Sequence, residues 1–143
     1  MEKGRSPLVR AFVIDASVAA GWFIPDEANC FSNRAMEQLE TYGAVVTDLL
    51  WHEMRSLLTI ARRRNRIPAE DVALSMVRLR ELNISTVAGH RDHSILELVC
   101  KYQLSAYDAA YLALALEHNL PLSTLDKQLI AAASQAGCAL VSA

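Results

Sequence analysis

The chain has 143 residues, of which 52% are hydrophobic, so it is long enough to bury the core of one compact domain. Its 14 basic and 16 acidic residues give a formal net charge of −2, which excludes a general electrostatic attraction to nucleic acid, and any RNA contact must be local. Three cysteines without a C-x-x-C pair argue against a disulfide framework and against a thiolate zinc site.

The apolar runs of the chain are too short for a membrane span. A charge or a proline interrupts each of them before it reaches ~18 residues, and residues 1–12 carry charges without the apolar stretch of an export signal. With its free thiols, the sequence predicts an unexported, cytoplasmic protein without a membrane association. We find no repeat or linker that divides the chain, so we expect one domain over residues 1–143.

Strand-like and helix-like patterns alternate along the chain. Short runs of β-forming residues predict strands, and apolar residues at helical spacing predict helices between them. The predicted order is strand 11–14, a helix from residue 15 that breaks at Pro25, helix 26–42, strand 44–47, a helix from residue 50, helix 68–82, strand 84–87, helix 92–102, a helix from residue 105, strand 120–124, helix 127–136 and strand 138–141.

Strands that are joined by helices need crossover connections, which produce a largely parallel sheet with helices on both faces. The stretch 109–116 is apolar on all sides, so its helix belongs in the interior. The sequence therefore predicts an α/β fold, a three-layer α/β/α sandwich with a mostly parallel five-stranded sheet.

Four carboxylates lie at or near the ends of these elements. Asp15 and Asp126 follow strands, and ligands of open parallel sheets bind outside the carboxyl ends of strands. Asp108 lies in the first turn of the apolar helix, where an unpaired charge is costly. Glu53 lies at the margin of its helix's buried stripe and can point toward the same crevice.

Carboxylates that converge without His or Cys partners suit a hard cation such as Mg²⁺ or Mn²⁺. Such an ion supports phosphodiester hydrolysis, because it neutralises phosphate charge and lowers the pKa of a bound water. Each acid also has an ordinary structural interpretation. Asp108 and Asp126 each follow a serine by three residues, as capping-box acids do; Asp15 could cap a helix, and Glu53 could form a salt bridge at a helix edge.

Four sequence segments resemble the acidic motifs of the PIN-domain family. They are FVIDASV around Asp15, LLWHEMRSLL around Glu53, LSAYDAAYLALA around Asp108 and LSTLDKQL around Asp126, in the family's order and spacing. The resemblance spans residue 12 to about residue 141. One departure is Ser56, where toxins of this family often carry Asn.

The resemblance implies a five-stranded parallel sheet, Mg²⁺ or Mn²⁺ in an acidic pocket, endonucleolytic RNA cleavage and a homodimer. The short single-domain form is similar to VapC-type toxins, which a small VapB-type antitoxin neutralises. Asp15, Glu53, Asp108 and Asp126 would then be catalytic and metal-binding residues. Ser17 and Thr124 match hydroxyl positions that accompany the first and fourth acids, where they could orient a carboxylate or a bound water. The sequence does not identify the RNA target.

One dense basic cluster, formed by Arg62, Arg63, Arg64 and Arg66, could contact RNA or an acidic stretch of antitoxin. It could equally be a solvated helix end, where cations complement the helix dipole. Two other functions stay open. One is a non-catalytic PIN-like module that binds RNA or protein, and the other is an α/β phosphotransferase that forms an aspartyl phosphate on Asp15. Asp15-Ala16-Ser17 lacks the second acid of the D-x-D phosphatase pattern.

Overall fold

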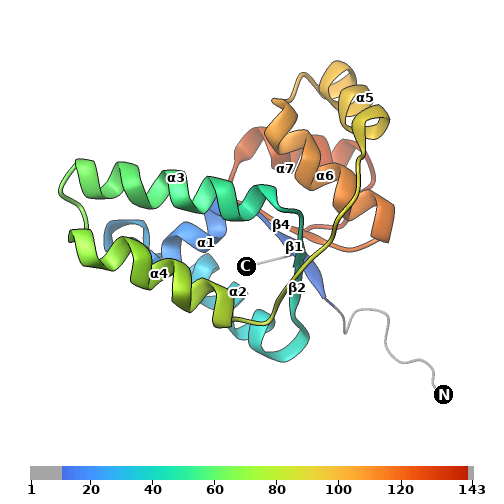
Figure 1. Ribbon diagram of the computed structural model, residues 1–143. Helices are drawn as coiled ribbons and strands as arrows, with labels where there is room; N and C mark the ends of the chain where they lie inside the picture. The colour runs from blue at the N-terminus through green and yellow to red at the C-terminus, as the bar shows by residue number, and fades with distance from the viewer. Residues whose placement is uncertain (1–10, 142–143) are drawn as a thin grey trace.

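The computed structural model describes residues 11–141 (Figure 1). The first ten residues, which enter the prediction about export, and residues 142–143 lie outside this range. The strands are β1 (Phe12–Ile14), β2 (Ala44–Val46), β3 (Ile84–Thr86) and β4 (Leu122–Ser123). The helices are α1 (Ala16–Phe23), the 3-10 turn η1 (Pro25–Glu27), α2 (Cys30–Tyr42), α3 (Leu49–Arg63), α4 (Ala69–Glu81), α5 (Asp92–Tyr102), α6 (Ala106–His118) and α7 (Lys127–Gln135).

The strands form one parallel sheet in the order β3-β2-β1-β4, so β1 lies inside the sheet. The fifth strand predicted over residues 138–141 is reduced to an isolated parallel bridge between Leu140 and Leu122. The physical reason is the shortness of its neighbour. β4 is only two residues long, and only its Leu122 pairs with residues 138–141. The Leu122 amide donates to the Ala139 carbonyl, and the Val141 amide donates to the Leu122 carbonyl, each over 2.9 Å.

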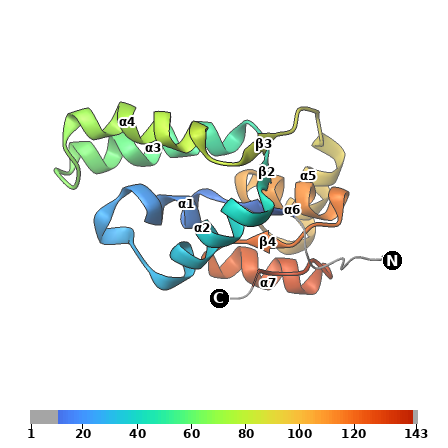
Figure 2. The same cartoon turned by 90° about the horizontal axis from the view of Figure 1, so that it is seen from below.

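Alternate residues of β1 point to opposite faces of the sheet, as the pleat of a strand requires. Val13 packs in a core with residues of α5, α6 and α7, whereas Phe12 and Ile14 pack in a core with residues of α1, α2 and α3. Figures 1 and 2 show α3 and α4 side by side as a hairpin that extends away from the sheet. The predicted α/β/α sandwich is therefore confirmed. Among residues 11–141, no helix has the length and apolar character that a membrane crossing needs.

The prediction of one helix over residues 26–42 is wrong at its beginning. Residues 25–27 form η1, and α2 starts only at Cys30. Asn29 sets this start, because its side chain accepts a hydrogen bond from the Ser32 amide (2.7 Å) and so caps the helix. The two acids of η1, Asp26 and Glu27, are instead bound by Arg66.

Candidate active site

Asp15 lies directly after β1 and is nearly fully buried, with 4% of its surface exposed. It caps α1 through the Val18 amide, which donates to Oδ1 over 3.4 Å. The Ser17 hydroxyl also donates to Oδ1 (2.6 Å), and the Thr124 hydroxyl donates to Oδ2. Both carboxylate oxygens are therefore held by the protein at the carboxyl end of a central strand.

The two hydroxyl residues also tie neighbouring loops together. The Leu125 amide donates to Ser17 Oγ (2.9 Å), and the Asp126 amide donates to Thr124 Oγ1 (3.0 Å). Ser17 and Thr124 thus link the start of α1 to the segment after β4. The sequence marked both residues as companions of the acids, and in the structure both contact Asp15.

Asp126 and Asp108 lie at the starts of two helices. Asp126 itself caps α7, since its Oδ1 accepts from the Leu129 amide (3.0 Å), so the capping box suggested for Ser123 and Asp126 is wrong. Ser105 caps α6 by accepting from the Asp108 amide (3.1 Å). The Asp108 carboxylate remains half-buried beside the pocket. Asp126 and Asp108 thus belong to capped helix starts and also line the pocket.

Glu53 projects from α3 toward α6, where the Tyr111 hydroxyl donates to its Oε1 over 2.6 Å. The sequence reasoning missed Tyr111. A signal was present, because a buried tyrosine hydroxyl needs a partner. Tyr111 is also three residues after Asp108 on the same helix, a spacing that places the two side chains on neighbouring positions of one face.

The four acids meet in one pocket of about 290 Å³ at the carboxyl edge of the sheet. Its lining residues come from the start of α1, the middle of α3, α6 and the start of α7. They are Asp15, Ala16, Ser17, Glu53, Ser56, Leu57, Asp108, Tyr111 and Asp126. Ser56, the departure from the toxin pattern, faces this pocket.

Burial and mutual repulsion both disfavour negative charge here. Burial raises the pKa of Asp15 to about 6, although the bonds from Ser17 and Thr124 act in the opposite direction. Burial likewise raises the pKa of Glu53, and the charge of Asp108 adds to this effect. The pKa of Asp108 is raised by burial and then by the charge of Asp126. None of the described residues lining the pocket is Lys or Arg, so a bound cation would reduce the repulsion between the carboxylates and favour their charged forms.

The chemistry of the donors fits a hard divalent cation. Every charged group in the pocket is a carboxylate, and hydroxyls of Ser17, Ser56 and Tyr111 surround them. Within residues 11–141, no three His, Cys, Asp or Glu side chains lie close enough to form a ready-made ligand set. Mg²⁺ suits such an arrangement, because it is usually bound by one or two carboxylates and keeps several waters.

The four arginines of the basic cluster have different surroundings in the structure. Arg66 donates from Nε to Asp26 Oδ2 (2.9 Å) and from Nη2 to Glu27 Oε2 (2.8 Å), which ties the loop after α3 to η1. Arg62, Arg63 and Arg64 are exposed at the end of α3. These three residues, and not Arg66, are free of that ion pair and can meet a partner.

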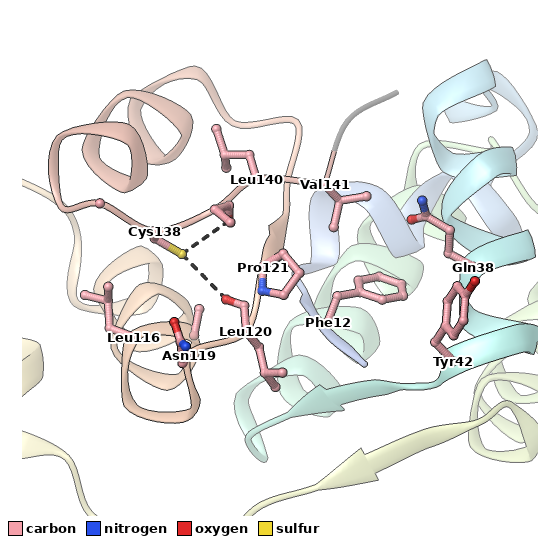
Figure 3. Close-up of a pocket in the computed structure, with 13 residues that line it drawn as sticks. Phe12, Gln38, Tyr42, Leu116, Asn119, Leu120, Pro121, Cys138, Leu140 and Val141 are labelled. Carbon is pink, nitrogen blue, oxygen red and sulfur yellow. Dashed lines mark hydrogen bonds between the residues drawn. The ribbon is translucent and has the colours of Figure 1, made fainter. Parts of the chain in front are cut away.

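A larger pocket, of about 430 Å³, lies at the other end of β1 (Figure 3). Phe12, the first residue of β1, forms one wall, and the segments around Pro121 and Leu140 form others. Its described lining residues include no carboxylate and no cationic side chain. Of these two pockets, only the acidic one contains carboxylates that suit hydrolysis.

Comparisons with known proteins bear on the family and the fold of this chain. Residues 12–141 match the model of the PIN domain. A curated relative, Ribonuclease VapC3 of Pyrobaculum aerophilum, is 30% identical over 121 residues, which cover 82% of this chain and 90% of the relative. The crystal structure of PAE2754 from Pyrobaculum aerophilum is similar with a TM-score of 0.69 at 16% identity and covers 89% of this chain and 87% of that one. The chain therefore belongs to the PIN-domain family.

Proposed function

We propose that this protein is a metal-dependent endoribonuclease that hydrolyses RNA phosphodiester bonds. The observation that carries the proposal is the convergence of Asp15, Glu53, Asp108 and Asp126 in one pocket of a PIN domain. RNA is the expected substrate class because the relative with 30% identity is a ribonuclease by name.

The four acids would hold Mg²⁺ or Mn²⁺, some of them directly and the others through waters of the ion. When bound, such an ion supplies neutralisation of phosphate charge and a lower pKa for an attacking water. Ser17 and Thr124 hold the Asp15 carboxylate in place, and Tyr111 holds that of Glu53. These bonds fix the donor oxygens before metal and substrate arrive, which reduces the cost of ordering them.

The biological role we propose is that of a toxin paired with a VapB-type antitoxin, in the cytoplasm and as a homodimer. The VapC name of the relative supports this role. Arg62, Arg63 and Arg64 offer a positive surface at the end of α3 for an acidic antitoxin segment or for RNA.

The structure argues against the phosphotransferase alternative. An aspartyl phosphate needs a carboxylate oxygen that can reach the phosphorus atom. Asp15 is 4% exposed, and its two oxygens accept bonds from Ser17, Val18 and Thr124. These contacts support a role for Asp15 as a fixed ligand rather than as a nucleophile.

Purified protein incubated with total cellular RNA tests the proposal. We expect cleavage with Mg²⁺ or Mn²⁺ and none with a chelator. Cleavage that persists in the chelator would rule out metal dependence, and intact RNA under all metal conditions would favour the non-catalytic module.

Induction of the gene in bacteria without a partner tests the toxin role. We expect growth arrest from the parent and normal growth from Asp15→Asn, because the substitution removes metal-binding charge at nearly constant volume. Equal arrest by both forms would show that the harm does not come from nuclease action.

A further inference from the structure

Basic side chains follow one exposed face of α3 from the acidic pocket toward the tip of the α3–α4 hairpin. His52, Arg55, Thr59 and Arg63 succeed one another at intervals of three or four residues, which places them on one face of the helix. The side chains of His52, Arg55 and Arg63 are exposed, and that of Thr59 is partly buried. From residue 54 to its end, α3 contains no acid. We call these four residues the outer face of α3.

The outer face begins at the acidic pocket. Ser56, which lines the pocket, is four residues after His52 and seven residues, or about two turns, before Arg63. The three side chains therefore project from the same side of the helix. At a rise of about 1.5 Å per residue, the path along α3 from Ser56 to Arg63 is about 10 Å long. Figure 1 shows this part of α3 leading away from the sheet.

Arg55 carries its charge without a carboxylate partner. Its Nη2 donates to His52 Nδ1 over 3.0 Å, and His52 Nε2 lies 2.9 Å from Asp48 Oδ2. A guanidinium can only donate, so His52 Nδ1 accepts and the ring proton on Nε2 is shared with Asp48. Within residues 11–141, Arg66 and Arg91 are held by ion pairs with acids, whereas no such pair is found for the arginines of the outer face. Their charges are therefore available to an anionic partner.

Helix stability explains only the far end of this pattern. The helix dipole favours cations in the last turn, which accounts for Arg62 and Arg63. Arg55 lies eight residues before the last residue of α3, beyond the reach of that effect. An exposed arginine needs no partner for stability. The alignment of Arg55 and Arg63 with Ser56 of the pocket, however, suits an extended anion that passes the pocket.

RNA is the extended anion that this arrangement fits best. Its backbone carries a negative charge on every phosphate, and in the function proposed above one of these phosphates lies in the acidic pocket. The strand continues from the pocket, and the outer face provides cations along one direction. Arginine suits this contact because its planar guanidinium can donate two parallel hydrogen bonds to one phosphate. An acidic protein segment is the other partner that such a face could bind, and the experiment below separates the two.

We propose that the outer face of α3 binds the phosphate backbone of RNA on one side of the bond in the acidic pocket, with Arg55 next to the pocket and Arg63 farther along the strand. The proposal rests on the function proposed above and adds the direction in which the RNA leaves the pocket. Contacts to phosphates fix the position of a strand without reading its sequence. The outer face should therefore contribute affinity for any RNA and no preference for a base.

The test is the salt dependence of RNA binding by Asp15→Asn protein, measured by fluorescence anisotropy with labelled oligo(U) and oligo(A) at constant Mn²⁺. For a single strand, each phosphate contact adds about 0.7 to the slope of log K against log salt concentration. Adding Arg55→Ala or Arg63→Ala should lower this slope by up to about 0.7 and weaken binding of both probes roughly threefold or more at low salt. Arg34→Ala, at an exposed position of α2, removes the same charge elsewhere and should change neither quantity.

Three results would overturn the proposal. They are an unchanged slope in both arginine variants of the outer face, an equal fall of the slope in Arg34→Ala, and the absence of RNA binding by Asp15→Asn protein at low salt. Polyglutamate serves as a second probe. If Arg55→Ala and Arg63→Ala lose affinity for polyglutamate but keep the RNA slope, the outer face binds acidic protein segments and the proposal is wrong.

Failure of the nuclease proposal looks different. If RNA binds through Arg55 and Arg63 but the parent cuts no RNA with Mn²⁺, the binding surface stands and the nuclease function does not. If the parent cuts RNA while the arginine variants bind it with the slope of Asp15→Asn protein, the nuclease function stands and the binding surface does not. Melting curves of the variants confirm that each is folded.

Discussion

The two ends of strand β1 differ in the kind of side chain that is buried there, apolar at the beginning and charged after the end. At its beginning Phe12, 2% exposed, packs against apolar residues and forms a wall of the larger pocket. Immediately after its end Asp15, 4% exposed, is a carboxylate whose pKa is raised to about 6 by burial. Burial of the Phe12 side chain therefore stabilises the fold, whereas burial of the Asp15 carboxylate opposes folding. A buried carboxylate whose charge opposes folding makes this end of the strand the candidate functional site.

Substitution of acids at the carboxyl end should have the largest effect on activity. We expect Asp15→Asn or Asp108→Asn to lower RNA cleavage by about a hundredfold or more, because each change removes a charge that would bind metal. Rates are measured with Mn²⁺ on a cleaved RNA. Tyr42→Ala, at the other end of the sheet, should keep the parent's rate. Full activity in both acid variants would contradict the assignment of the site.

Substitution at the beginning of β1 should have the converse effect. Phe12→Ala should lower the free energy of unfolding by about 3 kcal/mol, since it removes a buried ring from the core. Urea unfolding measures the loss. The cleavage rate per folded molecule should stay that of the parent, and a rate that falls together with stability would show that the two ends are not separate.

The sequence predicted those helix starts that a nearby capping side chain determines. The break between β1 and α1 at Asp15 and the start of α6 after Ser105 agree with the structure, because side-chain caps fix both positions. It placed the start of α2 too early, since the cap at Asn29 and the ion pairs of Arg66 decide that boundary.

Contacts between distant segments were harder to foresee. The bond from Tyr111 to Glu53 joins residues 58 positions apart, and no spacing in the sequence encodes it. The last strand became a single bridge because β4 is too short to pair with more of it. Asp15, Asp108 and Asp126 were selected because they lie at recognisable element ends, and Glu53 because it lies at the margin of a buried helix stripe. Their mutual distances depend on packing.

The metal-free protein should show the cost of burying Asp15 as a dependence on pH. Between about pH 4 and pH 6 the folded carboxyl keeps a proton that the unfolded chain has lost, so stability falls as the pH rises. The difference between about 6 and 3.8 corresponds to roughly 3 kcal/mol above pH 6 as an upper value. Asp15→Asn should lack this loss. Urea unfolding in chelator at both ends of the range measures it, and parallel pH profiles for the two proteins would refute it.

The central claim, that the carboxylates share a divalent cation, is tested most directly by calorimetric melting with chelator and then with Mn²⁺. The parent's melting temperature should rise by roughly 4 °C or more when Mn²⁺ is about a hundredfold above its Kd, because only the folded state binds the ion. Metal-free Asp108→Asn should be at least as stable as the parent, since Asp126 and Asp108 repel each other, and it should lose most of the metal-dependent gain. No shift in the parent at millimolar Mn²⁺, or the same shift in Asp108→Asn, would contradict the account.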